Sequence, residues 1–189
     1  MGIALPKKKS SGSTLMTEGT IWKHILLFSI PLILGNMLQQ LYNTVDSIVV
    51  GNSLGSEALA AVGSSSSLIS LLISFSMGAA AGAGVIVSQF IGAQNEKGVH
   101  ESVHTALAIA LILGVVLTVL GVTLSPQILR WMGTPDEVMP QSVIYLRLYF
   151  AGLLFSVLYN MASGILNAVG NSKRSLLYLA IASFTNIVL

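Results

Sequence analysis

Long stretches without a single Asp, Glu, Lys or Arg recur along this chain of 189 residues, and they constrain its fold more than any other feature. They cover residues 25–45, 58–95, 102–129, 148–172 and 175–189. About 20 apolar residues in a helix cross the hydrocarbon core of a bilayer. Only 8% of the residues are charged, against about 25% in a typical soluble domain. The sequence therefore predicts an all-α, polytopic membrane helix bundle.

Polar and turn-forming segments between these stretches set the expected boundaries. We expect residues 1–20 to form a flexible cytoplasmic tail and residues 21–189 to form one transmembrane lobe. Segment 51–57 is an expected turn. Prolines and an apolar cluster in segment 125–140 favour a short helix that lies in the membrane interface. The expected helices cover residues 22–50, 58–91, 101–124, 141–169 and 175–189, of which the last is incomplete.

The distribution of basic residues predicts the orientation of these helices. With the N-terminus in the cytoplasm, the inner segments hold most of the lysines and arginines, including Lys97, Lys173 and Arg174, whereas Arg130 and Arg147 fall toward the outer side. The positive-inside rule favours this arrangement. The net charge of +2 is too small to indicate a nucleic-acid partner, and the chain has no cysteine for disulfide or thiol chemistry.

A stripe of polar side chains marks the first apolar stretch. Asp46 follows Asn43, Gln39 and Asn36 by three, seven and ten residues, which places all four on one helix face. Tyr42 flanks the stripe. A carboxylate near the middle of a membrane helix costs about 2.5–3.5 kcal/mol, so such residues usually face a protein interior or an aqueous cavity. The alternative is a purely structural role, in which the amides only hydrogen-bond to neighbouring helices.

The helix that carries this stripe is predicted to bend. Pro31 removes a backbone donor and its ring clashes one turn back along the helix, and Gly35 lies one turn further on. A second polar group enters the bundle in the last apolar stretch, at Asn186. A bendable helix with an acidic residue on it is suited to a conformational switch.

Other residues are weaker candidates for a functional site. His100 and His104 have a spacing possible for metal ligands, but no further ligand is evident nearby, so we expect no metal there. We expect Arg147 to extend toward the membrane surface. The Gly-rich segment 78–84 lacks the lysine and the preceding strand of a phosphate-binding loop, and we expect it to allow close helix packing. No nucleophile, base and acid stand together, so the chain is not expected to be an enzyme.

Residues 16–63 read MTEGTIWKHILLFSIPLILGNMLQQLYNTVDSIVVGNSLGSEALAAVG, and the later segments QFIGAQNEKG, YLRLYFAG, LNAVGNSKRS and TNIVL follow in order. Together these segments resemble the multidrug and toxic compound extrusion (MATE) transporters, in particular their bacterial multidrug-pump branch. The resemblance implies a fold of twelve helices in two lobes, with about five of the six helices of the N-terminal lobe in this chain. It also implies cation-coupled export of bulky, often cationic compounds by alternating access, across the cytoplasmic membrane of a bacterium.

The resemblance also implies roles for individual residues. Asp46 and the helix-five residue Asn186 would bind the coupling ion, which is H⁺ or Na⁺, and no other cofactor or metal is expected. The acidic partner of Asn186 would fall just past Leu189. Pro31 would be the bending point of the first helix. We expect the substrate cavity to be lined by Asn36, Gln39, Tyr42 and Asn43. The expected partners are the lipid bilayer, drug-like small molecules and the C-terminal remainder of the transporter.

Two other functions remain open on the sequence alone. A flippase for lipid-linked precursors, from the same wider superfamily, would share the two-lobe plan, but its cavity would need several basic residues for phosphate, and the membrane-embedded part offers only Arg147. A non-transporting membrane scaffold would fit the small-residue segment 78–84. The sequence does not distinguish H⁺ from Na⁺, because the same carboxylate and amide oxygens can bind either.

Overall fold

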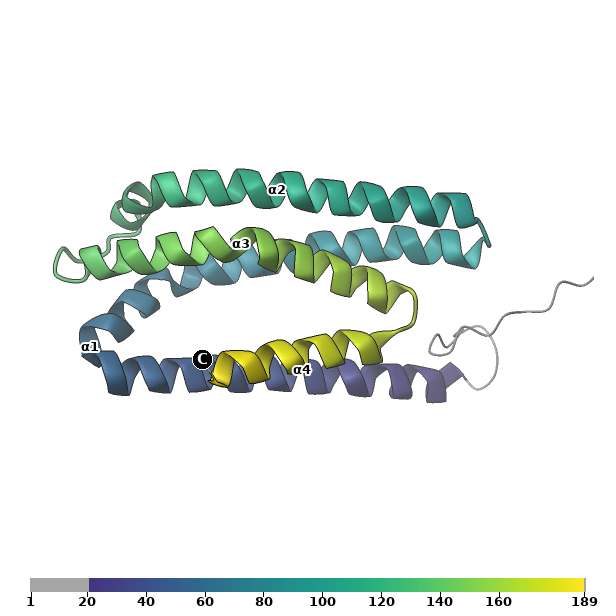
Figure 1. The fold of residues 1–189 in the computed structure, drawn as a ribbon, viewed down its shortest axis with the longest axis horizontal. Helices are drawn as coiled ribbons and strands as arrows, with labels where there is room; N and C mark the ends of the chain where they lie inside the picture. The colour runs from purple at the N-terminus through teal and green to yellow at the C-terminus, as the bar shows by residue number, and fades with distance from the viewer. Residues whose placement is uncertain (1–20, 189) are drawn as a thin grey trace, which may run out of the picture.

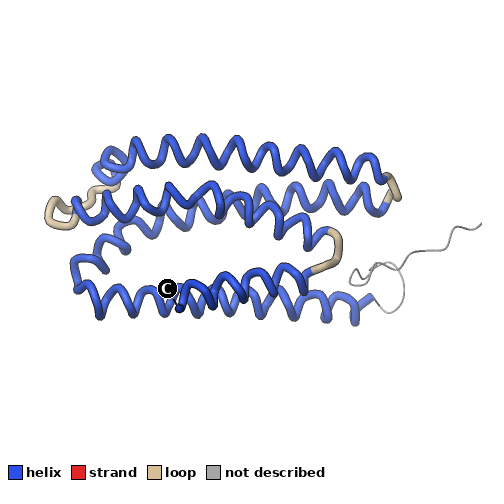
Figure 2. The backbone as a smooth tube through the Cα atoms, in the orientation of Figure 1, coloured by secondary structure: helices blue, strands red, loops and turns tan. Residues whose placement is uncertain are grey.

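The computed structural model describes residues 21–188, which fold almost entirely into helices joined by short loops (Figure 2). In this part of the chain, four stretches are long and apolar enough to cross a membrane. The predicted all-α membrane bundle is confirmed. The helices are α1 (Ile21–Gly92), α2 (Glu96–Trp131), α3 (Met139–Ala168) and α4 (Ser172–Val188).

Helix α1 contains two of the candidate spans, Ile25–Val45 and Ala60–Gly92, which we call its first arm and its second arm. The sequence predicts a turn at residues 51–57, but the structure assigns helix throughout this segment. Figure 1 shows that the α1 ribbon nevertheless reverses direction between the two arms. Gly51 and Gly55 lie in this segment, and glycine weakens a helix and allows sharp bends. The chain therefore returns across the bundle without a loop.

The helices form two layers (Figure 1). Helices α2 and α3 pack with the second arm of α1, and α4 packs beside the first arm. The buried apolar core lies within the three-helix layer. Its buried members are Leu72, Ala80, Ala106, Ala110, Leu129, Leu146, Phe150, Leu153, Val157 and Met161.

Helix α2 is longer than the sequence predicts, and the expected interfacial helix in segment 125–140 is wrong. Residues 125–131 continue α2, and the loop that follows covers only 132–138. Pro126 is tolerated inside the helix because it removes only one backbone hydrogen bond. The Ser125 hydroxyl donates to the Gly121 carbonyl one turn earlier, and Leu129 is fully buried in the core. Burial of this last turn against its neighbours explains why it does not turn into the interface.

Large side chains on α3 pack against small residues on α2. A Cβ atom added to Gly121 would lie 1.9 Å from the Phe150 ring, and one added to Gly114 would lie 2.6 Å from the Leu154 side chain. Both distances are far below van der Waals contact, so only glycine leaves room for these α3 side chains. Between membrane helices, packing of this kind replaces the hydrophobic effect as the main source of attraction.

Helix α3 approaches the second arm of α1 even more closely. A Cβ added to Gly164 would lie 2.7 Å from the backbone oxygen of Ala80, and one added to Gly84 would lie 3.2 Å from the backbone oxygen of Gly164. The two helix backbones therefore touch. The predicted close packing of segment 78–84 occurs through Ala80 and Gly84, whereas a Cβ at Gly78 or Gly82 would meet nothing within 4 Å.

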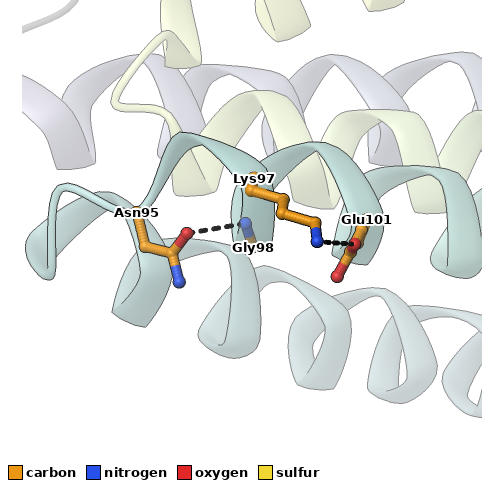
Figure 3. A network of polar contacts seen from close by, with 4 residues as sticks. All are labelled: Asn95, Lys97, Gly98 and Glu101. Carbon is orange, nitrogen blue, oxygen red and sulfur yellow. Dashed lines mark hydrogen bonds and ion pairs between the residues drawn. The ribbon is translucent and has the colours of Figure 1, made fainter.

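The turn between α1 and α2 is fixed by local contacts, which Figure 3 shows. The Asn95 side chain accepts a hydrogen bond of 2.9 Å from the Gly98 backbone N–H, which caps the start of α2. Lys97 and Glu101 form an ion pair at 3.7 Å on the exposed side of this turn, where such pairs contribute little. Gly98 is buried, and a Cβ there would lie 2.3 Å from the Phe90 ring. These contacts hold the ends of α1 and α2 together.

We predict that Gly164→Ala destabilises the lobe whereas Gly152→Ala, on the same helix, does not. The added methyl group at Gly164 would press on the Ala80 backbone, and overpacking of this kind costs about 1–3 kcal/mol. A Cβ at Gly152 meets nothing within 4 Å, so alanine there should be neutral or stabilise the helix by up to about 1 kcal/mol. Thermal unfolding in detergent measures both. Equal stabilities of the two variants would contradict the backbone contact.

Candidate functional site

The predicted bending point lies where the first arm of α1 packs against α4. Pro31 and Gly35, one turn apart, are both buried on this arm. A Cβ added to Gly35 would lie 3.3 Å from the Leu179 side chain and 3.8 Å from that of Leu176. Glycine at position 35 thus lets α4 approach the first arm one turn after the proline. Figure 1 shows the two helices side by side and running in the same direction.

This contact fixes how far along the two parallel helices the predicted cation-coupling residues lie. Asn186 lies seven residues beyond Leu179, and Asn43 lies eight residues beyond Gly35, which is about two turns along each helix. Asp46 lies less than one turn further along α1. The backbone segments that carry Asp46 and Asn186 are therefore at a similar level of the lobe. The side chains of these two residues lie outside the described residues, and their role in binding the coupling ion stays a prediction.

The predicted cavity-lining stripe is only partly enclosed in this lobe. Asn36 and Asn43 are exposed, and Gln39 is half-buried. The side chain of Tyr42 lies outside the described residues. The stripe lies beside the face of α1 that Gly35 presents to α4, because Gln39 follows Gly35 by one turn. The structure therefore brings Gln39 to the edge of the helix contact, and its assignment to the substrate cavity stays a prediction.

Ser183 on α4 is a buried polar residue that the sequence analysis did not single out. It follows Leu179 by one turn and therefore shares the α4 face that packs against the first arm of α1. Its side chain is 6% exposed, and its hydroxyl has no hydrogen-bond partner among the described residues. A buried hydroxyl without a hydrogen bond costs free energy. This part of the contact between α1 and α4 therefore contains a polar group whose hydrogen-bonding capacity is unused.

A separate cavity of about 610 Å³ lies between the second arm of α1 and the C-terminal half of α3. Apolar and small residues make up most of its wall, and hydroxyl and amide groups supply the rest. None of the described residues that line it carries a charge. They are Met77, Ala80, Ala81, Gly84, Val85, Ser88, Gln89, Asn160, Ser163, Gly164, Asn167 and Ala168.

The polar part of this cavity comes mainly from one face of α3. Asn160, Ser163 and Asn167 are three and four residues apart and so line up along the helix. The Asn160 side-chain nitrogen donates to the Ser156 backbone oxygen at 2.9 Å. The Asn167 side-chain oxygen is enclosed by protein atoms, and the described residues supply it with no hydrogen-bond partner.

The α1 side of the cavity adds a hydroxyl close to the end of α3. The Ser88 hydroxyl donates to the Gly84 backbone oxygen at 2.8 Å and lies 3.5 Å from that of Ala168. The sequence analysis did not identify the polar residues of this cavity, although the small-residue segment 78–84 supplies part of its wall. Two amides and a serine at helical spacing on α3 could have signalled them, by the same pattern that drew attention to the first helix.

The remaining polar candidates do not form a second centre in residues 21–188. The rings of His100 and His104 stack at 4.0 Å between centroids, and His104 Nδ1 lies 2.8 Å from the His100 backbone oxygen. No group of three or more His, Cys, Asp or Glu side chains in the described range could hold a metal ion. Arg147 is exposed on α3.

We predict that thiol cross-linking will detect the contact between α1 and α4. The native chain has no cysteine, so only the introduced cysteines can react with a thiol reagent. Gly35→Cys combined with Leu179→Cys should be joined by a short bifunctional thiol reagent, because a Cβ at position 35 would lie 3.3 Å from the Leu179 side chain. Mass spectrometry of digested protein detects the product.

The matched control for this experiment is Met37→Cys combined with Leu179→Cys. Met37 is on the same arm but 64% exposed, so this pair should not be joined. Equal yields from the two pairs, or no product from the first, would contradict the placement of α4 on the Gly35 face.

Comparisons with known proteins agree with this arrangement. The family model described as MatE matches residues 31–189. The chain is 38% identical over 173 residues to the probable multidrug resistance protein YoeA of Bacillus subtilis, a match covering 92% of this chain and 37% of that protein. It is 35% identical to the probable multidrug resistance protein YpnP of the same organism, over 92% of this chain and 39% of that protein.

A solved structure shares the fold. A crystal structure of MATE in complex with MaD3S superimposes with a TM-score of 0.82 at 34% sequence identity, over 88% of this chain and 37% of that one. The chain thus spans less than two-fifths of the length of these relatives, which corresponds to one lobe.

Proposed function

This chain belongs to the MatE family of multidrug transporters, as the sequence predicted, and from that premise we propose that it forms the N-terminal lobe of a cation-coupled antiporter for bulky, often cationic compounds. Membership makes it part of a multi-pass membrane protein that handles small molecules. The observation that supports the finer proposal best is the packing of α4 against the first arm of α1 at Gly35, one turn after Pro31.

In this proposal the lobe lies in the cytoplasmic membrane of a bacterium with its N-terminus inside. The loop from α1 to α2 and the start of α4 then lie on the inner side, together with Lys97, Lys173 and Arg174. The loop from α2 to α3 and the bend between the arms of α1 lie on the outer side. The positive-inside rule supports this orientation.

Coupling would arise because the cation and the exported compound favour different conformations of the transporter. A proton or Na⁺ that reaches Asp46 from outside neutralises its carboxylate, and the first arm of α1 then bends at Pro31 and shifts the amide stripe. Exchange requires the two ligands to have different affinities for the two conformations. Pro31 supplies the weak point, because residue 27 loses its usual backbone donor there.

Drug export fits the described cavity better than a phosphate-bearing lipid precursor would. The cavity residues include no lysine, arginine or histidine. A phosphate headgroup needs cationic or multiple N–H donors, whereas an amphipathic drug needs apolar walls with a few polar groups. The scaffold alternative is separated from both by the transport experiments below.

We predict that Asp46→Asn in the complete transporter abolishes ion-driven efflux without lowering expression. An amide at this position cannot exchange a proton and binds Na⁺ more weakly than a carboxylate. Dye efflux from proteoliposomes under combined pH and sodium gradients measures the effect, which should reduce efflux to that of protein-free vesicles. The control is Glu137→Gln, the same chemical change at an exposed loop position, which should retain efflux. Wild-type rates in Asp46→Asn would refute the assignment.

We predict that a single gradient suffices to drive wild-type efflux. A carboxylate with neighbouring amides can bind either ion, but each transport cycle needs only one ion to neutralise it. Proteoliposomes loaded with dye receive either a pH gradient or a sodium gradient, with the membrane potential clamped. Efflux under one of them identifies the coupling ion. No efflux under either gradient would contradict antiport and favour the scaffold function.

A further inference from the structure

The first turns of α2 carry the sequence HESVH, from His100 to His104. On a helix, the pattern His-Glu-X-X-His places two imidazoles on one face, at the spacing with which such pairs bind zinc. A pattern this short acquires meaning only from the structure around it. Helix α2 begins at Glu96, so both histidines lie on regular helix, away from the contact between α1 and α4 and from the cavity.

The two imidazole rings lie together in the structure. The centroids of the His100 and His104 rings are 4.0 Å apart, and the ring planes differ by 30°. Two nitrogens that bind one ion at about 2.0–2.1 Å are themselves roughly 3–3.5 Å apart, so the spacing of the rings is of the same size. Both side chains are exposed. An ion therefore reaches them without displacing a packed neighbour.

The ring of His104 is held in the orientation and tautomer of a metal ligand. Its Nδ1 lies 2.8 Å from the His100 backbone oxygen. A carbonyl oxygen only accepts hydrogen bonds, so Nδ1 carries the hydrogen, and Nε2 of the neutral ring keeps its lone pair. Metal-binding histidines usually donate their second ring nitrogen to a backbone carbonyl or a carboxylate in this way. His104 thus presents Nε2 as a ligand.

The charges in the same turns favour a cation. Glu96 precedes His100 by one turn on the same helix face, and Glu101 follows it directly. Lys97 is ion-paired with Glu101 at 3.7 Å (Figure 3), which offsets part of its positive charge. Two carboxylates against one ammonium group leave this end of α2 with an excess of negative charge, which attracts cations.

We propose that His100 and His104 form an exposed, two-nitrogen site for a divalent transition-metal ion of the Zn²⁺, Ni²⁺ and Cu²⁺ class. Imidazole nitrogen suits these ions, whereas Mg²⁺ and Ca²⁺ prefer oxygen ligands. The sequence-based expectation of no metal rested on the missing third ligand. The described residues supply no group of three or more such ligands, so an ion held by this pair takes its other ligands from water. Ion binding here does not depend on the proposed antiport.

Titration of Ni²⁺ into the complete transporter, purified in detergent without a polyhistidine tag, tests this site. Isothermal titration calorimetry should show one more bound ion per wild-type chain than per chain of the double variant His100→Gln, His104→Gln. Each single variant should bind that ion at least about tenfold more weakly, because one imidazole cannot chelate it. With Cu²⁺ as the probe, electron paramagnetic resonance should detect two nitrogen ligands in the wild type and one in each single variant.

Two controls separate chelation from a mere count of histidines. The chain has three histidines, and His24→Gln, the same change at the third, should leave the affinity unchanged. His104→Gln combined with Thr105→His keeps the number of histidines but moves the second imidazole by about 100° around the helix. Thr105 is exposed, so the fold should tolerate the change, and binding should be as weak as in His104→Gln alone.

Three results would overturn the proposal. Equal Ni²⁺ affinity and stoichiometry in the wild type and the double variant would remove the pair from ion binding. Wild-type affinity in the variant with histidine at position 105 would show that no chelate forms, and an equal loss in His24→Gln would assign the ion elsewhere. Equal melting temperatures of all variants without metal show that they are folded, so a change in titration reports on the ligands.

Discussion

Contact between helix backbones at small residues is the interaction on which the described lobe depends. Lipid tails are as apolar as the helix surfaces, so the hydrophobic effect gives little reason for one membrane helix to prefer another. Van der Waals contact must supply that preference, and a gap of about 0.5–1 Å already loses roughly a quarter to a half of the attraction. Gly164 against the Ala80 backbone, and Gly121 against the Phe150 ring, provide it on the two sides of α3.

The same packing explains where the cavity lies. Helix α3 meets the second arm of α1 tightly at Gly84 and Gly164, and both of these residues also line the cavity. Small residues therefore serve two purposes at this place: they let the backbones touch, and they leave space beside the contact. Of the α3 amides beside this contact, Asn160 is satisfied within its own helix, because its side-chain nitrogen donates to the Ser156 backbone oxygen.

The sequence by itself determined the class of fold and the family. Charge-free stretches of membrane-spanning length leave helices as the way to satisfy the backbone in lipid, so the helical bundle follows from composition and length. The motif from residue 16 onward was enough to predict the family that the comparisons established. Pro31 and Gly35 were identified from the sequence because their effects on a helix are local.

Only the tertiary structure decided how these elements meet. The α2 helix runs past Pro126 because Leu129 is buried against other helices, which no local signal reports. The level of Asn186 relative to the first arm of α1, and the cavity beside Asn167, both result from packing between segments more than 70 residues apart in the sequence. Periodicity along one helix shows which side chains share a face, but the neighbour of that face is set by shape complementarity among all the helices.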